Sequence, residues 1–365
     1  MANDLLTDAA AGARNLLQGC LRAQPGEKLL LLSESPEHGF YDRGAPDAVA
    51  EQAVAMGLSV DRREVPFVRT AEDADKETWE RMREADCTVF FARLGDQIRF
   101  QTRPHAARAA MVYALDEGML GSRYGIASHD GFVQLKKLID AAVANASRIR
   151  LTCPLGTDLA GCFPDEARRR AEAEGEVAIR RFPMATFKPV PAAEFSGEVV
   201  ISRFLTGTGH RYYTPYDLLL DKPVVARVAG GRVSGYAGPA EEVETVRRHV
   251  ARVGERFGID PAIIHSWHAG IHPGCAYLPD AFQNLARWGN AAFANPRLLH
   301  FHTCGDYAPG EISWNIVDPT IELDGVALWD NGVLHPERIP GGAELLAEWP
   351  DVREVFQSPR REIGF

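Results

Sequence analysis

The first 150 residues alternate between two periodicities, and this alternation limits the folds open to the chain more than any other feature. Short apolar runs such as Leu29-Leu30-Leu31-Leu32 and Cys87 to Ala92 alternate with segments of helical spacing such as Pro46 to Met56. An unbroken apolar run is typical of a strand buried on both faces of a parallel sheet. We therefore predict a Rossmann-like α/β domain over residues 1–150. The same pattern predicts a strand at Val60 to Val65 and helices at Asp75 to Ala85, Pro104 to Asp116 and Gln134 to Ala146.

Beyond residue 150 the pattern changes to short strands with few helices. Gly230-Gly231 and Asp324-Gly325 separate strand-like segments and are typical of hairpin turns. Helical spacing is confined to Ala240 to Phe257 and Pro279 to Phe293. We predict that residues 151–365 form an α+β domain rich in antiparallel strands.

Composition and charge narrow the classes of partner. The chain has 40 Lys and Arg against 50 Asp and Glu, a net charge of −10, which does not favour nucleic acid or an anionic membrane. No Gly-x-Gly-x-x-Gly or Gly-Lys-Ser/Thr motif supports nucleotide binding. The six cysteines include no Cys-x-x-Cys pair, and Asp4, Asp8 and Arg14 interrupt the leucines near residue 1. We expect a cytoplasmic protein that acts on a small molecule.

Histidines are concentrated in one part of the second half. Five of the eleven lie between residues 265 and 302, namely His265, His268, His272, His300 and His302. Neutral imidazole is a frequent ligand of zinc and iron, and its pKa near neutrality also suits proton transfer. The concentration predicts a site in the second domain, and a metal site in particular.

The two groups of histidines differ in their expected backbone. Gly270 and Pro273 interrupt helical spacing around the first group, so we expect an irregular loop over residues 265–272. His300-Phe301-His302 follows two leucines and predicts a strand, where alternation directs both imidazoles to one face. The alternatives are polar loop histidines in the first group and a satisfied core histidine in the second.

Nearby carboxylates and one thiol are further candidates. Asp318 ends the apolar run Ser313 to Val317, and a buried carboxylate there needs a cation as partner, so we favour it as a metal ligand over Asp306 and Glu311. Cys304 beside the histidines leaves a Cys/His nucleophilic pair as an alternative.

Aromatic and imidazole side chains elsewhere are candidates for substrate binding. Tyrosines could hydrogen-bond or stack on an aromatic or acidic substrate, although an aromatic rim over the core is the alternative. The candidates are His105, His210, Tyr212, Tyr213 and Trp267.

Several short motifs resemble one superfamily. The run Leu151 to Leu159 resembles the segment that opens the C-terminal domain of aminopeptidase T-type metallopeptidases, and the length and layout are similar to their 2,5-dihydroxypyridine 5,6-dioxygenase branch. Ala269 to Pro273 is similar to a Gly-x-Asn-Pro turn, with His272 in the Asn place. Ile316-Val317-Asp318 stands where the superfamily has a His-x-Asp pair, and Trp329 to Gly332 resembles its closing hairpin.

The resemblance implies different chemistry in its two branches. The peptidases use two metals held partly by glutamates, whereas this region offers histidines. The dioxygenases hold one Fe(II) with two histidines and an aspartate, which leaves positions for O2 and substrate. The resemblance therefore implies Fe(II) and a homo-oligomer. Because Ile316 replaces the expected histidine, the imidazole ligands are sought among His265, His268, His300 and His302, with Asp318 as the carboxylate.

Three functions follow from these residues. The first is an Fe(II)-dependent ring-cleaving dioxygenase that uses O2 on a hydroxylated aromatic or N-heteroaromatic compound, with His268 or His272 as proton acceptor. The second is a hydrolase using water activated by Zn or Co, with Glu311 as general base. The third is a non-catalytic protein with a decayed metal site, which Ile316 favours.

Overall fold

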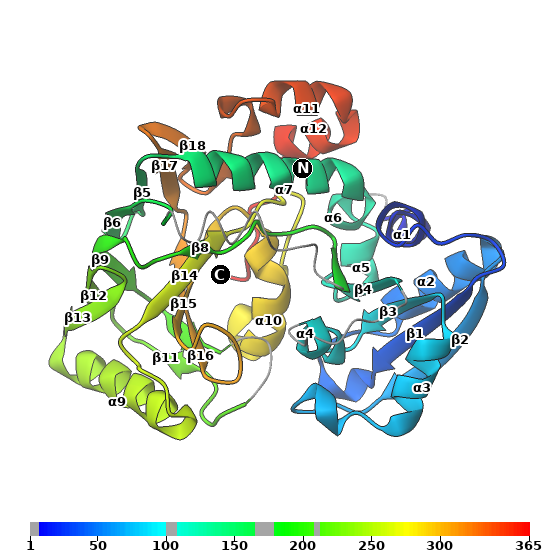
Figure 1. Ribbon diagram of the computed structural model, residues 1–365, viewed down its shortest axis with the longest axis horizontal. Coiled ribbons are helices and arrows are strands. Elements are labelled where there is room, and N and C mark those ends of the chain that lie inside the picture. The colour runs from blue at the N-terminus through cyan, green and yellow to red at the C-terminus, as the bar shows by residue number, and fades with distance from the viewer. Residues whose placement is uncertain (1–6, 100–107, 165–178, 208–211) are drawn as a thin grey trace.

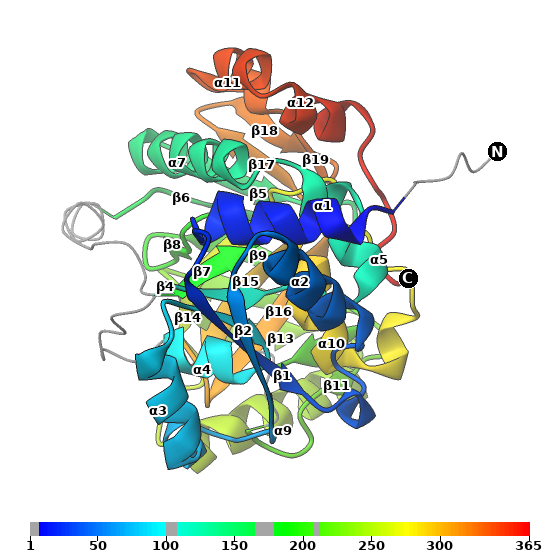
Figure 2. The same cartoon turned by 90° about the vertical axis from the view of Figure 1, so that its right-hand side faces the viewer.

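The computed structural model describes residues 7–99, 108–164, 179–207 and 212–365. Figure 1 shows two halves side by side, an α/β half built from the beginning of the chain and a half rich in strands. Figure 2, turned by 90°, shows the N-terminal helices α1 (Ala9–Arg14) and α2 (Gly44–Ala55) on the outside of the first half. The predicted combination of a parallel sheet with a strand-rich α+β part is confirmed.

The first half is organised around a five-stranded sheet whose strand pairs are all parallel. Its central strand β3 is buried along its whole length, as its apolar sequence predicts. Helix α3 (Lys76–Glu84) falls within the range predicted from helical spacing, and α2 overlaps its predicted range but begins at Gly44. In order across the sheet, the strands are β2 (Ser59–Val65), β1 (Lys28–Glu34), β3 (Cys87–Phe91), β4 (Arg108–Val112) and β7 (Ile179–Phe182).

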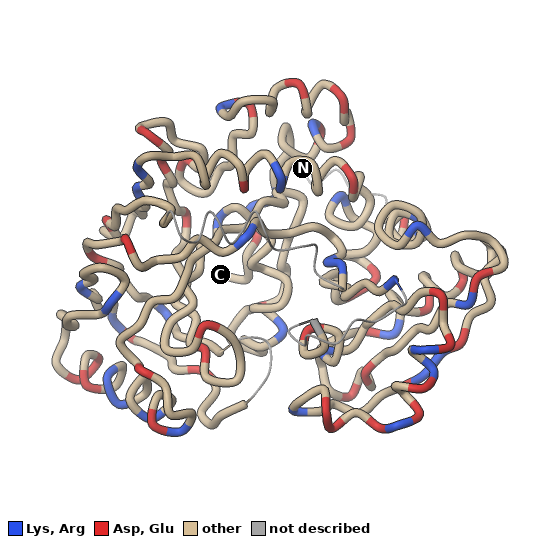
Figure 3. Tube along the Cα trace, in the orientation of Figure 1, with Lys and Arg blue, Asp and Glu red and all other residues tan. Residues whose placement is uncertain are grey.

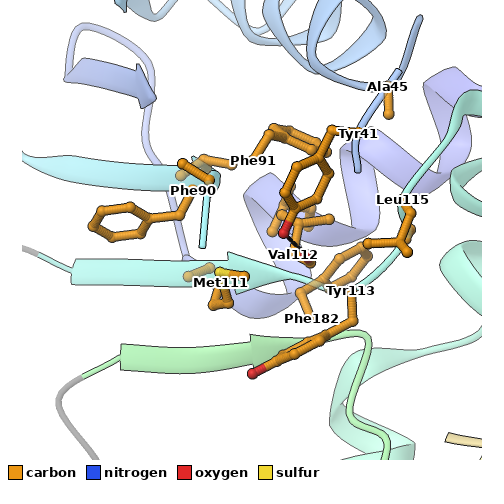
Figure 4. Close-up of a cluster of buried hydrophobic side chains, with 14 of the residues drawn as sticks. Tyr41, Ala45, Phe90, Phe91, Met111, Val112, Tyr113, Leu115 and Phe182 are labelled. Atoms are coloured by element: carbon orange, nitrogen blue, oxygen red, sulfur yellow. Dashed lines mark hydrogen bonds between the residues drawn. The ribbon is translucent and has the colours of Figure 1, made fainter. Parts of the chain in front are cut away.

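One predicted helix is wrong. The segment from residue 104 to 116 contains β4, which pairs with β3 and β7 on its two sides. Four of its five residues are buried, because Ala109, Ala110, Met111 and Val112 lie between two helix-covered faces. Figure 4 shows Met111 and Val112 among aromatic side chains, with the Tyr41 hydroxyl donating to the Val112 carbonyl oxygen at 3.1 Å.

The two halves exchange segments around the expected boundary at residue 150. Strand β7 follows that boundary and nevertheless completes the first sheet beside β4. Helix α7 (His129–Asn145) precedes the boundary, but its Phe132, Leu135 and Ile139 belong to the core of the second half. Figure 1 shows α11 (Gly342–Glu348) and α12 (Pro350–Gln357) lying over α7.

Two sheets with antiparallel strand pairs form the second half. Their shared core contains Trp267, Phe301 and Trp314 from one sheet and Ile321 and Trp329 from the other. The eight-stranded sheet has, in order, β13 (Arg232–Ala237), β12 (Val224–Ala229), β9 (Ser196–Ile201), β6 (Asp158–Gly161), β5 (Ile149–Thr152), β17 (Thr320–Leu323), β18 (Val326–Asp330) and β19 (Val333–Leu334). The six-stranded sheet has β11 (Leu218–Leu219), β10 (Phe204–Thr206), β16 (Glu311–Val317), β15 (Leu298–Cys304), β14 (Ile264–Ala269) and β8 (Val190–Pro191).

Two further helices pack against different cores. The long helix α9 (Ala240–Phe257) packs through Val246, Val250 and Val253 into its core. Helix α10 (Leu285–Ala291) lies between the halves in Figure 1, and its Trp288 belongs to the core of the first sheet. Figure 3 shows acidic and basic residues interspersed along both halves. Among the described helices, none combines the length and apolar character needed to cross a bilayer.

Candidate metal centre

The candidate centre lies on one face of the six-stranded sheet. Strand β14 includes His265 and His268, so the predicted loop over residues 265–272 is wrong for its first five residues. Gly270 and Pro273 follow the end of this strand instead of interrupting a loop. Cross-strand pairing places His268 opposite His300 on β15, and neighbouring register positions place Ser266 opposite His302. Residues opposite each other in an antiparallel pair point to the same face.

Three imidazoles converge on that face. The Nε2 atom of His268 lies 2.5 Å from Nε2 of His300 and 3.1 Å from Nε2 of His302. All three side chains are buried, and their candidate ligand atoms lie within 4.8 Å of one another. These three histidines could hold one metal ion after a small adjustment, since nitrogens that share a tetrahedral zinc at about 2.0–2.1 Å lie roughly 3.3 Å apart. The shorter 2.5 Å contact between His268 and His300 is a hydrogen-bond distance. The predicted strand with both histidines on one face is confirmed.

Oxygen atoms lie behind two of the imidazoles, one at a hydrogen-bond contact and one at an ion-pair distance. Nδ1 of His268 lies 3.3 Å from the carbonyl oxygen of Phe187, and Nδ1 of His302 lies 3.2 Å from Oε1 of Glu311. A proton on Nδ1 directed at such an oxygen leaves the lone pair of Nε2 free for a metal. The ring of Phe293 stacks on His300 at 4.1 Å between centroids.

Electrostatics differ between the imidazoles. Burial, with His268 and His302 nearby, holds the pKa of His300 well below its usual value, so this ring stays neutral. Burial also acts to lower the pKa of His302, but Glu311 and Asp306 together outweigh it and raise that pKa above its usual value. The centre thus joins a firmly neutral imidazole to one that is paired with a carboxylate.

Glu311 lies behind the histidines. Its side chain is buried, accepts a hydrogen bond from Oγ of Ser313 at 3.1 Å and faces Nδ1 of His302, the ring nitrogen remote from the converging Nε2 atoms. This placement suits orientation of His302 better than the predicted role of Glu311 as general base, which would take a proton from a metal-bound water. The Tyr213 hydroxyl donates to the backbone oxygen of Glu311 at 2.9 Å and so supports the same strand.

Asp318 does not join the three histidines. Its two carboxylate oxygens accept from Nε and Nη2 of Arg297, both at 2.6 Å, and Arg361 lies 3.3 Å away. The partners of this carboxylate are guanidinium groups, where the sequence favoured a metal ion. Asp318 follows the end of β16 with a left-handed backbone (φ 50°), which takes it out of the strand alternation.

Ile316 is also separated from the centre. It lies opposite Leu299 and belongs to the apolar core between the two sheets. Because alternate residues of a strand point to opposite faces, any side chain at position 316 of β16 points away from His300 and His302. The isoleucine is therefore a core residue in this fold, and it does not mark a decayed ligand of the three-histidine cluster.

The other two clustered histidines have structural surroundings. Nε2 of His265 lies 2.9 Å from the backbone oxygen of Cys304. His272 is fully buried, stacks on Phe132 at 3.7 Å between centroids and accepts the Gly274 amide at Nδ1, and burial lowers its pKa to about 3. Neither shares the cluster formed by the other three, so the predicted ligand His265 and the predicted proton acceptor His272 lie elsewhere.

The remaining candidates are scattered. Trp267 lies in the core on the opposite face of β14, so it is not placed to stack on a molecule at the histidine face. Tyr212 is packed against the second core, and burial raises its pKa to about 12. Burial also raises the pKa of the Cys304 thiol to about 11, which disfavours a nucleophilic thiolate. His105 and His210 lie outside the described residues.

Sequence reasoning missed Ser313 and Asn315 of β16. Glu311-Ile312-Ser313-Trp314-Asn315-Ile316 alternates polar with apolar residues, the pattern of a strand with one polar face. Asn315 lies opposite His300, and Ser313 lies opposite His302. Treating residues 313–317 as an apolar run concealed this signal.

Comparison with known proteins gives a likeness in fold. No protein-family model matches the sequence, and no match to a curated protein was found. The structure of 2,5-dihydroxypyridine dioxygenase from Pseudomonas putida KT2440 is similar at a TM-score of 0.60 and 14% identity, over 90% of this chain and 98% of that one. Wild-type AmpT from Thermus thermophilus gives a TM-score of 0.43 and 12% identity, over 86% and 94%. The first of these matches shows a shared fold.

Proposed function

We propose that this protein is an enzyme with one metal ion held by His268, His300 and His302. The observation that carries this proposal is the convergence of three buried Nε2 atoms on one face of the sheet. Three buried imidazoles this close together offer ligand atoms for one cation, and this supports the proposal. This set replaces the expected combination of His265 with Asp318.

The donor set fits a borderline metal. Imidazole suits Fe(II), Zn(II), Cu(II) and Ni(II), whereas Mg(II) and Ca(II) prefer oxygen ligands. The Phe187 carbonyl oxygen and the Glu311 carboxylate would hold the rings of His268 and His302 with Nε2 directed at the metal. Phe293 covers one face of His300 and limits the access of water to it.

For the reaction, we propose cleavage of a hydroxylated aromatic or N-heteroaromatic ring by O2 with Fe(II). A bound Fe(II) supplies adjacent positions for a ring hydroxyl and O2 and passes charge between them. Two points support this choice. Three protein ligands leave coordination positions open, and the fold is similar to that of a dioxygenase. The protein would contribute fixed ligand geometry and a dry environment around the reacting atoms.

A hydrolase is the second candidate, because three histidines are also the ligand set of some catalytic zinc sites. Water bound to such a zinc ion loses a proton near neutral pH and becomes a nucleophile. The position of Glu311 behind His302 gives this candidate less support than the sequence did, since the carboxylate is not directed toward the converging Nε2 atoms.

Metal content and O2 uptake distinguish these functions. We would strip the full-length protein of metal, reconstitute it anaerobically with Fe(II), Zn(II) or Co(II), and measure metal per chain. O2 consumption would then be followed with a panel of catechols and hydroxypyridines. We expect one Fe(II) per chain and O2 uptake with at least one compound. One Zn(II) per chain with hydrolysis of ester or amide probes would favour the hydrolase, and failure to bind any metal would overturn both.

A further inference from the structure

The polar face that carries the histidines continues onto the next two strands. Asn315 on β16 lies opposite His300, and Ser313 lies opposite His302. On the far side of β16, Thr206 of β10 lies opposite Ser313. Since opposed residues of antiparallel strands share a face, Asn315 and Thr206 lie on the same face as the three imidazoles.

Two of these polar side chains lack partners. Asn315 is only 4% exposed, and neither its Nδ2 nor its Oδ1 makes a hydrogen bond. Thr206 is 1% exposed, and its Oγ1 is likewise unpaired. Ser313 between them is satisfied, because it donates to Glu311. Unpaired buried polar atoms destabilise a fold, so a group of them beside a candidate metal centre indicates a ligand that completes them.

We propose that Asn315 and Thr206 form a substrate subsite that recognises a neutral amide or lactam group. The position of this subsite beside a metal rests on the proposed function, whereas its recognition of an amide group does not depend on a metal. The carboxamide of Asn315 offers one donor and one acceptor side by side, and the complementary group presents a carbonyl oxygen next to an N–H. A carboxylate can only accept hydrogen bonds and would leave Oδ1 of Asn315 unpaired.

The spacing suits one aromatic molecule that reaches both the metal and the subsite. Directly opposed side chains such as His300 and Asn315 have Cβ atoms roughly 5 Å apart. Thr206 lies one strand beyond Ser313, and adjacent strands are about 4.8 Å apart. A six-membered ring with a metal-binding oxygen on one side and an amide edge on the other would span this distance.

The test combines stability with binding in the full-length chain. Asn315→Leu and Thr206→Val preserve approximate side-chain volume and remove the unpaired polar atoms. We expect both metal-free variants to have a Tm equal to or higher than that of the wild type, because no native hydrogen bond is lost. Calorimetric titration should show benzamide binding weakened at least ~10-fold by Asn315→Leu and about 3-fold by Thr206→Val.

Thr303→Val is the matched control. Thr303 is as buried as Thr206, but its hydroxyl donates to the Ile312 carbonyl oxygen at 2.8 Å. It lies opposite Ile312, on the face of the sheet that points away from Asn315. This variant should lower Tm and leave the affinity for benzamide unchanged. N,N-dimethylbenzamide, which lacks the N–H, and benzoate, which lacks any donor, should bind at least ~10-fold more weakly than benzamide to the wild type.

Titrations with and without metal separate the two proposals. A chain that binds benzamide but holds no metal would overturn the proposed enzyme and support the subsite. A clear loss of Tm in both Asn315→Leu and Thr206→Val, with benzamide affinity unchanged, would show a structural role and overturn the subsite. Tighter binding of benzoate than of benzamide, or no binding of benzamide by the wild type, would also overturn it.

Discussion

Each half of the molecule buries a polar cluster, and the two clusters differ in how completely they are paired. In the first half, Arg93 donates to Glu34 from its backbone amide, Nε and Nη2, at 2.6–3.1 Å. The guanidinium lies between the rings of Phe40 and Phe67, at 4.5 and 4.1 Å. In the second half, the Nε2 atoms of His300 and His302 lie 2.5 and 3.1 Å from Nε2 of His268, and the Asn315 carboxamide makes no hydrogen bond.

The contrast separates a structural cluster from a candidate site. Glu34 ends β1, and Arg93 follows β3, so the pair occupies the carboxyl edge where the strand order of the parallel sheet reverses. Open α/β sheets commonly bind ligands at that edge, but here a closed ion pair fills it. Burial of charge alone therefore does not identify a site in this protein. In the second cluster, the side-chain atoms without a partner include both polar atoms of Asn315, on the face of the three histidines.

The largest expected effect is loss of metal from His300→Ala. Removing one of three ligands should reduce metal affinity by more than the roughly 10–100-fold typical of changes behind the ligands. Metal per chain after dialysis would measure this. His265→Ala is the matched control, because His265 lies on β14 but outside the cluster. Retention of metal by His300→Ala, with loss in His265→Ala, would contradict the assignment of the ligands.

Breaking the buried pair of Glu34 and Arg93 should lower the stability of the fold and leave metal binding unchanged. Glu34→Ala leaves the Arg93 guanidinium buried without its carboxylate, which we expect to destabilise the fold by about 3–5 kcal/mol. Urea unfolding would measure the change. Asp158→Asn breaks the exposed pair with Arg150 and should cost less than about 1 kcal/mol. Equal losses of unfolding free energy in the two variants would contradict the expected difference between a buried ion pair and an exposed one.

A smaller effect is expected from Glu311→Gln. The neutral amide holds His302 less firmly than the carboxylate does, so metal affinity should fall by about 10–100-fold. Competition with a chromophoric chelator would measure the affinity. Asp318→Asn, which weakens the pairing with Arg297 away from the cluster, should leave metal affinity unchanged. Loss of metal affinity in Asp318→Asn, with no loss in Glu311→Gln, would instead indicate that Asp318 is a metal ligand.

The smallest expected effect concerns a buried histidine outside the cluster. Burial lowers the pKa of His272 from 6.5 to about 3, so the unfolded chain takes up the proton first as the pH falls. Its contribution to stability is present above pH 6.5 and is lost progressively toward pH 3, with a slope of up to about 1.4 kcal/mol per pH unit. Urea unfolding of the metal-free protein between pH 7 and pH 5 should be less pH-dependent for His272→Gln. Identical slopes in both proteins would contradict this account.

The sequence predicted the architecture better than it predicted the site. Apolar runs such as Leu29 to Leu32 predict buried strands directly, because a strand covered on both faces has no alternation of polar and apolar residues. The segment from residue 104 to 116 failed because its alanines and Met111 suit a helix as well as a buried strand. In that segment, pairing with β7, which is remote in sequence, decides the outcome.

Assigning the site required strand register, which the sequence does not contain. His300 and His302 were placed correctly because their spacing fixes a shared face. His268 could not be distinguished from His265 and His272 without the pairing of β14 with β15. Asp318 was predicted as a metal ligand for a similar reason. Its arginine partners come from positions 297 and 361, and no pattern in the neighbouring sequence predicts them.

The position of strand β7 in the sequence affects how the first sheet forms during synthesis of the chain. The ribosome releases β4 well before β7, so a nascent chain ending near residue 150 has an unpaired edge at Arg108–Val112. Such an edge can pair with another chain until its own partner strand arrives. A cut at residue 150 would therefore separate the first sheet from one of its five strands, because β7 is encoded with the second half.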